Sequence, residues 1–458
     1  MRFNHRKRRG QTLVLFLGFV AAMVGMMLVV FNSGQVTNAK MRAMNAADAA
    51  AYSGAVWEAR SLNFQAYMNR AMVVNEVTIA QSVSLRSWVA YVARFVENVN
   101  MVTQFIPWVG TATTQIKQVL NQVSKSMNNL LPQADMALRG VNVLAHSAQQ
   151  GFYTTGSVIA QELASEVVTA NKAQMSPAGK ELMASNTANW LRFTKHYNGP
   201  ERTRIKAVTL DSRDGFSQNR DNTALALGPV MEVAKQGGTD LIDYDSWKGL
   251  DSSELRTFKI AGKWTGKTPL AWGGAQSYAP SRKTGIGTHG EENDWRRTDG
   301  QRARTEANAT IPSFFANANA KKIGIQSFQG YYDIRDPKTK KADLQLPFSV
   351  EVVVPKTAIA TSTSALNGKA ALVNGTQIEH DPNYAGGGGV YALAEACVRF
   401  ARPYRQDRAD EATEFPSLFN PYWTASLATE SKSARAWVDA RKGLIPSLTA
   451  VFTKDTCS

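Results

Sequence analysis

The chain has 458 residues, of which 44% are hydrophobic and 19% are charged. This composition is typical of globular proteins and excludes disorder along the whole chain, and the length is sufficient for two domains with buried cores. The formal net charge is +15. No nucleic-acid-binding motif accompanies the basic residues, so the sequence predicts a solvated basic surface and no nucleic-acid partner.

The start of the chain predicts a basic tail, residues 1–10, and a transmembrane helix, residues 11–33. No charged residue lies between Arg9 and Lys40, and the segment Leu13–Phe31 is apolar and contains no proline. About 20 apolar residues allow an α-helix to cross roughly 30 Å of hydrocarbon. Positive residues beside a first span hold that end of the chain in the cytoplasm. We therefore expect a single-pass protein in a lipid bilayer, with its N-terminus cytoplasmic and its bulk exported.

Small residues recur at a spacing of four in the predicted span, where Gly18 precedes Ala22 and Ala21 precedes Gly25. Such spacing allows two membrane helices to approach closely. The pattern therefore predicts helix packing here, with other single-span proteins or with a second copy of this chain. The alternative is that these residues only reflect how common small side chains are in membrane spans.

Residues 34–196 predict a helical periplasmic stalk or bundle. The segment 40–105 contains no proline and is rich in Ala, Met, Arg, Glu and Gln, which favour helix. Its apolar residues recur at helical spacing, so we expect the transmembrane helix to continue outward. Residues 105–113 predict a turn or an interfacial segment. Helical pattern resumes at 114–148 and 157–196, with predicted breaks at Pro132 and Pro177.

An alanine-rich tract, NAADAAAYSGA, occupies residues 45–55. Its Ala, Ser and Gly side chains have little bulk, so another helix can pack tightly against it. Asp48 is the one charged residue of the tract. It either pairs with a basic group of a partner or faces water.

The basic tail, the sequence RGQTLVLF (9–16), the single span and the tract 45–55 together resemble the N-terminal module of TadG-like Flp (tight-adherence) pilus-assembly proteins of bacteria. The resemblance implies an inner-membrane protein with its bulk in the periplasm, and partners among single-span pilus or pseudopilus-like proteins. Asn32 stands where family members often carry Asp. The metal-site motif of some members is absent, so the resemblance implies no metal-dependent adhesion. The segment 415–427 is similar to a subset of the family.

The junction between Gly10 and Gln11 resembles the cleavage site of prepilins, which are cut after a Gly that follows a basic leader. Cleavage there would make Gln11 the first residue of the mature chain. Pilins then carry Glu at the fifth position, where this chain has Leu15. This departure argues against packing into a pilus shaft, although processing at Gly10 stays an alternative.

Residues 197–458 predict a mixed α+β periplasmic domain, because helical periodicity fades after residue 196. FSVEVVV, 348–354, alternates as a strand does, and AALVNGTQIE, 370–379, predicts a hairpin through its Asn-Gly pair. Two further strands are expected at 255–264 and 325–336, with a long loop at 281–322 between them. Helices are expected at 390–403 and 431–443, and an aromatic loop at 415–427. The fold class is thus α+β, with a transmembrane helix, a helical stalk or bundle and a strand-containing exported domain.

Two patterns match phosphate-binding motifs without their required context. AGKWTGKT, 261–268, has a relaxed P-loop form, but Pro269 and the Gly273-Gly274 pair leave no room for the helix that must follow. We expect a hairpin or loop there. GIGTHG, 285–290, lacks an apolar strand before it. Neither pattern predicts a nucleotide site.

No constellation of catalytic or metal-binding residues emerges, and no cofactor is expected. The cluster His289, Glu291, Glu292 and Asp294 is expected to face water, with cation binding as the alternative. His146, His196 and His380 are isolated in the sequence. The cysteines are Cys397 and Cys457, which predict either one disulfide in an oxidising compartment or, for Cys397, a small buried residue.

These observations lead to three functional hypotheses. The first is a membrane-anchored, non-enzymatic component of a Flp/Tad-type pilus assembly or a related secretion machine. The second is a minor pilin that is cleaved after Gly10 and incorporated in a pilus. The third is a membrane-anchored periplasmic enzyme that acts on the cell wall or on glycans, with carboxylates that the sequence pattern does not identify.

Overall fold

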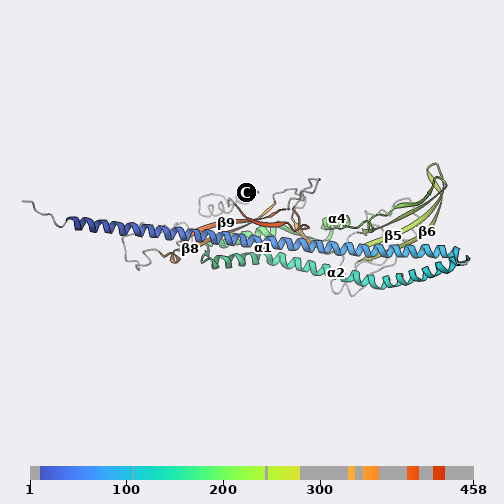
Figure 1. Ribbon diagram of the computed structural model, residues 1–458, viewed down its shortest axis with the longest axis horizontal. Helices are drawn as coiled ribbons and strands as arrows, with labels where there is room; N and C mark the ends of the chain where they lie inside the picture. Colours follow the sequence, from blue (N-terminus) through green and yellow to red (C-terminus); the bar gives the residue numbers. More distant parts are fainter. Residues whose placement is uncertain are drawn as a thin grey trace, which may run out of the picture. The chain divides into compact units, whose positions relative to one another are not determined.

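The computed structural model describes residues 11–106, 108–242, 246–278, 328–335, 344–360, 389–401 and 416–428. Its helices are α1 (Gln11–Thr103), α2 (Val109–Ala170), α3 (Pro177–Phe193) and α4 (Thr203–Asp211), with 3₁₀ turns at Gly199–Glu201 and Lys356–Ala358. Figure 1 shows the two long helices, α1 and α2. The predicted α+β class, with a long N-terminal helix followed by strands, is confirmed.

The strands form two antiparallel four-stranded sheets and one two-stranded pair, ordered β1-β8-β9-β10, β3-β4-β5-β6 and β2-β7. Their bounds are β1 Gln174–Met175, β2 Thr194–Tyr197, β3 Asn222–Leu227, β4 Met231–Ile242, β5 Ser246–Ile260, β6 Lys263–Tyr278, β7 Tyr331–Ile334, β8 Gln345–Pro355, β9 Gly389–Phe400 and β10 Trp423–Leu427.

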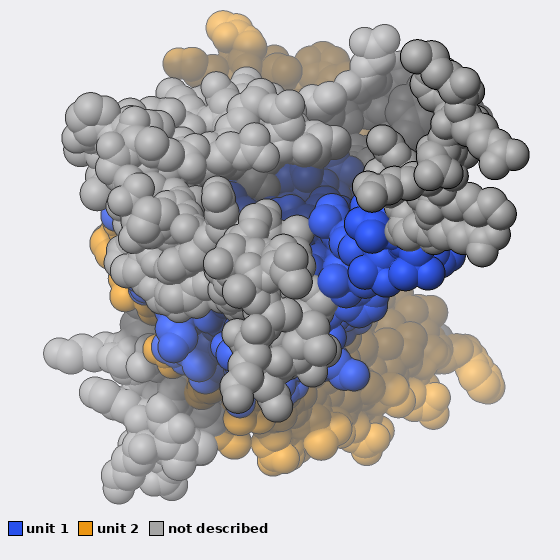
Figure 2. Space-filling model, turned by 90° about the vertical axis from the view of Figure 1, so that its left-hand side faces the viewer, with its two compact units in different colours: residues 1–64, 151–195, 334–458 blue, residues 65–150, 196–333 orange. Residues whose placement is uncertain are grey.

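Two compact units divide the chain, coloured separately in Figure 2. Unit 1 comprises residues 1–64, 151–195 and 334–458, and unit 2 comprises residues 65–150 and 196–333. Each unit thus combines a part of α1 and a part of α2 with its own sheet. The predicted division into a helical stalk, 34–196, and a separate mixed domain, 197–458, does not coincide with these units, because strands distant in sequence pack against the helices.

In unit 1 the β8–β9 pair is covered on both faces. On one face a Cβ added at Gly54 of α1 would lie 2.3 Å from Cε1 of Phe348. On the other face Ala178 and Leu182 of α3 pack against Tyr391 and Leu393 of β9. Phe348 pairs with Ala396, which lies three residues after Leu393, so the side chains of Phe348 and Leu393 point to opposite faces. Helix packing on both faces explains why β8 is buried along most of its length.

In unit 2 the parts of α1 and α2 form an antiparallel hairpin joined by polar contacts. Asn100 accepts from Thr113 at 2.7 Å near the turn, and Asp135 accepts from Ser82 at 2.9 Å farther along. At the other end Gln149 donates to Asn69 at 2.7 Å. As the α1 residue number falls, the α2 number rises, which is the register of an antiparallel pair. The predicted turn near residues 105–113 lies at its tip.

The sheet of unit 2 packs on the same part of α1. Ser84 shares a 2.6 Å hydrogen bond with Thr239 of β4, and Ser87 donates to Asp251 of β5 at 2.6 Å. A Cβ at Gly273 would lie 2.2 Å from the backbone nitrogen of Tyr91. Glycine at 273 therefore allows β6 to approach the α1 backbone closely.

Several local predictions are wrong. The predicted helix 390–403 is strand β9, which pairs with β8 from Gln345↔Arg399 to Pro355↔Gly389. One face of β9 is formed by five buried small or apolar residues, Val390, Ala392, Ala394, Ala396 and Val398. Pairing along the whole of β8 satisfies the backbone of this segment, so tertiary contacts override its helical propensity.

Pro132 does not break the second helix, since α2 continues through it to Ala170. A proline inside a helix removes one backbone hydrogen bond and costs about 3 kcal/mol. The buried side chains of Asp135, Arg139 and Asn142 in the following turns fix α2 in place. Pro177, by contrast, marks a boundary, because it opens α3 after the N-cap residue Ser176, which accepts from the Gly179 N–H.

The remaining predictions concern strands and loops between residues 255 and 443. Strand 348–354 is confirmed within β8, and the predicted strand 255–264 is a hairpin of β5 and β6. The predicted strand 325–336 contains the short β7, and the end of the predicted aromatic loop, 423–427, is β10. Strands β3 and β4 had no sequence prediction. The hairpin at 370–379, the loop at 281–322 and the helix at 431–443 lie outside the described residues.

Candidate functional site: an apolar helix joined to a sheet

The first turns of α1 present apolar side chains to their surroundings. Among the described residues, one helix is long and apolar enough to cross a membrane, and it is this one. Residues 12–24 are all exposed, with Leu15 at 74%. Because burial of apolar surface is favourable, a helix that leaves so many of these side chains uncovered requires an apolar environment.

The small residues of this segment lie on one side of α1. Gly18, Ala21, Ala22 and Gly25 are spaced i, i+3, i+4 and i+7, so they share a helix face. Among the described residues, no heavy atom approaches within 4 Å of a Cβ placed at Gly18 or Gly25. The stripe is therefore open for contact with lipid or with another helix. Whether another helix packs there stays a prediction.

The predicted processing junction lies at the edge of the described chain. Gln11 is the first residue of α1, and Gly10 lies outside the described residues. Leu15, which stands where pilins carry Glu, is exposed with its apolar neighbours. Processing at Gly10 stays a prediction.

The alanine-rich tract packs against the protein's own sheet. Ala46, Ala47, Ala50, Ala51 and Ala55 have no exposed surface. One turn before the tract, Nζ of Lys40 donates to the backbone oxygen of Tyr391 in β9 at 2.6 Å, and Gly54 contacts Phe348 in β8 as described above. The small side chains allow α1 to lie close to the strands. Asp48 is exposed, and so it lies on the side of α1 that faces away from this contact.

A carboxyl group without a partner follows the tract. Glu58 has no exposed surface, and within the described part of the chain neither of its oxygens has a hydrogen-bond partner. Burial of a charged carboxylate without a partner costs several kcal/mol, so the neutral form is favoured in such a place. Sequence patterns did not single out Glu58, because a lone Glu in a helix is indistinguishable from a solvated one.

A buried polar cluster joins the helices and the sheet of unit 2. Glu76 of α1 accepts from Asn142 of α2 at 3.1 Å and from the indole of Trp247 in β5 at 2.9 Å. Asp135 lies nearby on α2. Burial raises the pKa of the Asp135 carboxyl to about 6, against the lowering effects of the Ser277 and Ser82 hydroxyls and of Arg139. The cluster fixes which residues of the two helices face the sheet.

Two histidines that are isolated in the sequence lie together in unit 2. The rings of His146 and His196 stack with centroids 5.1 Å apart, and His196 stacks on Tyr332 at 4.9 Å. Burial and the neighbouring His196 lower the pKa of His146, and burial lowers the pKa of His196. Both rings are therefore neutral at pH 7. The two histidines are 50 residues apart in the sequence, and α2 and β2 bring them together.

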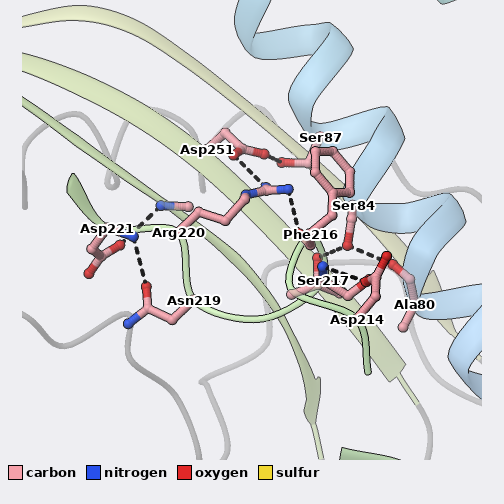
Figure 3. A network of polar contacts seen from close by, with 12 residues as sticks. Ala80, Ser84, Ser87, Asp214, Phe216, Ser217, Asn219, Arg220, Asp221 and Asp251 are labelled. Carbon is pink, nitrogen blue, oxygen red and sulfur yellow. Dashed lines mark hydrogen bonds and ion pairs between the residues drawn. The ribbon is translucent and has the colours of Figure 1, made fainter. Parts of the chain in front are cut away.

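A second polar network holds the segment after α4 against α1 and β5 (Figure 3). The guanidinium of Arg220 donates to Asp251 at 2.6 Å and lies over the Phe216 ring, 4.2 Å from its centroid. Ser87 of α1 donates to the other oxygen of Asp251. The ion pair between Arg220 and Asp251 and the hydrogen bond from Ser87 therefore link three parts of unit 2.

The described residues contain no group of three or more His, Cys, Asp or Glu that is arranged to hold a metal ion. The P-loop-like segment 261–268 begins with a tight turn, where Ala261 and Gly262 both have positive φ, and continues as β6. The predicted hairpin is thus confirmed there. The segment 285–290 and the cluster His289, Glu291, Glu292 and Asp294 lie outside the described residues, as does His380.

Cys397 is a buried residue of β9. Cys457 lies outside the described residues, so the disulfide between them stays a prediction.

Comparison with known proteins identifies one family. Residues 10–57 match the family model described as putative Flp pilus-assembly TadE/G-like. No match to the chain was found among curated proteins or among solved structures. The predicted resemblance is confirmed for this N-terminal segment, which runs from the start of the apolar helix to the part of α1 that packs on β8. The match supports a role related to pilus assembly.

Proposed function

We propose that this protein is a membrane-anchored, non-enzymatic component of a Flp/Tad-type pilus assembly or a related secretion machine. Residues 11–33 anchor it in the bacterial inner membrane, with residues 1–10 in the cytoplasm and the two units in the periplasm. The anchor packs with other single-span pilus proteins or with a second copy. The periplasmic units present surfaces to partners of the assembly.

One observation carries this proposal. The segment that matches the pilus-assembly family, residues 10–57, contains both the exposed apolar start of α1 and the alanine-rich tract that docks on β8 and β9. The matched segment is thus a structural connector: its first part requires an apolar environment, and its second part fixes a folded unit to the same helix. A connector of this kind suits a component that holds a periplasmic domain at an assembly site in the membrane.

The proposed helix packing is tested by adding bulk to the small-residue stripe. We expect Gly18→Leu together with Ala22→Leu to lower cross-linking of the protein to its single-span partners in membranes by about tenfold. Close packing through small residues is lost when larger side chains separate the helices, and a loss of about 1.4 kcal/mol is tenfold in association. The measurement is the yield of cross-linked product from photoreactive residues placed at Ala21.

The matched control is Val20→Leu together with Met27→Leu, which changes the opposite side of the same helix. We expect this pair to leave the cross-linking yield unchanged. Equal yields from both double variants would contradict packing through the stripe while leaving the anchoring role intact. If the wild-type protein were absent from the membrane fraction of the cells, the anchoring role itself would be contradicted.

The enzyme hypothesis predicts a different result. Purified full-length protein in detergent would release soluble fragments from peptidoglycan if it acted on the cell wall. We expect no release above that of a heat-denatured sample. Turnover of peptidoglycan would replace the assembly role with that of an anchored enzyme.

A further inference from the structure

One end of unit 2 carries exposed apolar side chains on three turns. The α1–α2 turn exposes Phe105 at 82% and Trp108 at 89%. The β5–β6 turn exposes Phe258 and Ile260, and the β3–β4 turn exposes Val230. We call this set of turns the apolar end of unit 2.

The contacts along α1 place these turns at the same end of the unit. As α1 advances from Glu76 to Ser87, its partners in β5 advance from Trp247 to Asp251. Farther along, Asn98 donates to the backbone oxygen of Leu270 in β6 at 2.6 Å, and Leu270 follows Pro269, which pairs with Glu254. The helix therefore runs toward the β5–β6 turn. The α1–α2 turn and the turn of β5 and β6 lie at the right-hand end of the ribbon in Figure 1.

Two aromatic residues at these turns have a strained backbone conformation. Trp108 and Phe258 have φ of 70° and 49°, in the left-handed region that favours Gly or Asn. A bulky residue is strained in this conformation. Each of these two aromatic side chains is more than half exposed. An aromatic residue at such a position suggests that the exposed side chain has a function.

The charges around the apolar end are basic or paired. Residues 98–116 contain no charged side chain, and the segment 255–268 contains Arg and Lys but no acid. Glu97, at the edge of the first segment, lies 3.0 Å from Arg94 and 3.4 Å from Lys117. Glu232 lies 2.7 Å from Arg256. Lys259 and Lys263, beside the β5–β6 turn, are exposed.

We propose that the apolar end of unit 2 inserts its turn side chains into the surface of a bilayer that contains anionic lipid. Trp and Phe on protruding turns suit the boundary between headgroups and acyl chains, where an amphipathic ring is stable. Lysines beside them are attracted to anionic headgroups. The side chains project from separate turns, which suits a fluid lipid surface better than a protein of fixed shape.

The test uses the full-length chain held by its N-terminal helix in nanodiscs of phosphatidylcholine. These nanodiscs are mixed with separate vesicles of phosphatidylcholine and phosphatidylglycerol in equal parts, and co-flotation is measured. We expect wild-type nanodiscs to float with the vesicles. Phe105→Ser together with Trp108→Ser lowers co-flotation about tenfold or more, since each substitution removes apolar surface that would be buried in the bilayer.

The matched control is Val141→Ser together with Leu144→Ser, two exposed apolar residues of α2 in the same unit. This pair leaves co-flotation unchanged, and so does the conservative pair Phe105→Leu with Trp108→Phe. High salt, or vesicles without phosphatidylglycerol, lowers co-flotation by weakening the attraction of the lysines. Circular dichroism of each variant confirms the helical content.

Absence of co-flotation by the wild-type protein overturns the proposal. So does an equal loss in the Val141 and Leu144 variant, because the binding would then not depend on the apolar end. Capture of a protein partner by this end, without capture of vesicles, would also overturn it and assign the surface to protein recognition. None of these results bears on the anchoring role of residues 11–33.

Discussion

At the scale of single residues, the buried acid Asp135 makes the stability of the fold depend on pH. Asp135 lies between α1, α2 and β6, where Ser82 donates to it at 2.9 Å. Burial raises its pKa to about 6 from an ordinary value of 3.8. In the folded chain the carboxyl therefore keeps its proton up to about pH 6, whereas in the unfolded chain it releases the proton near pH 4. Its contribution to stability is greatest below about pH 4 and falls as the pH rises to about 6.

This sign predicts how Asp135→Asn behaves. Asparagine removes the cost of a buried charge, so the variant gains stability relative to wild type as the pH rises from 4 to 7. Between pH 4.5 and pH 7.5 the gain is on the order of 2 kcal/mol, since this interval covers about 1.5 units of the pKa difference and each unit corresponds to about 1.4 kcal/mol. The measurement is thermal unfolding in detergent micelles at pH 4.5 and pH 7.5.

Asp211→Asn is the matched control, because Asp211 is exposed at the end of α4. We expect its effect on unfolding to be the same at both pH values. A pH-independent difference between Asp135→Asn and wild type would show that Asp135 is not buried as a neutral acid.

At the scale of elements, the contact between α1 and β8 depends on the absence of a side chain at Gly54. A Cβ there would lie 2.3 Å from Phe348, whose ring has no exposed surface. The ring is enclosed, so it cannot move aside without disturbing the sheet. This contact joins the family-matched segment to the first four-stranded sheet, and one added methyl group tests it.

We expect Gly54→Ala to destabilise the protein by about 1–3 kcal/mol through overpacking. The control is Gly151→Ala, at an exposed position of α2 where no neighbouring atom lies within 4 Å. That change is expected to stabilise the helix by about 0.5–1 kcal/mol, because Ala has the higher helix propensity. Opposite signs in thermal unfolding support the packing of α1 on β8, and a stabilising Gly54→Ala would contradict it.

At the scale of the whole molecule, the intact mass of the native protein separates the assembly component from the minor pilin. We expect a full-length mass, with Met1 present or trimmed, because Leu15 replaces the Glu that pilins use in their shaft. Mass spectrometry of protein extracted from bacterial membranes provides the measurement. A mass that lacks residues 1–10 would show cleavage after Gly10 and make the minor pilin the favoured identity.

The sequence by itself determined the features that depend on local composition. The charge-free segment from Gln11 to Ala39 is long and apolar enough to predict a membrane-crossing helix. The basic tail, residues 9–16, the span and the tract 45–55 together were sufficient for the family resemblance. Alternation in residues 348–354 predicted a strand, and Pro269 with the Gly273-Gly274 pair predicted a hairpin or loop in place of a phosphate-binding helix at 261–268. These signals are local because helix length, side-chain alternation and turn conformation are decided by neighbours in the chain.

Only the tertiary structure decided the rest. Residues 390–400 form a strand because β8 offers an edge for eleven consecutive pairs, although the same residues have good helical propensity. α2 continues through Pro132 because buried polar partners fix the turns after it. The neighbourhoods of Asp135, Glu58 and the pair His146 and His196 likewise depend on segments far apart in sequence. Burial and pairing of this kind arise from long-range packing, and no pattern of neighbouring residues records it.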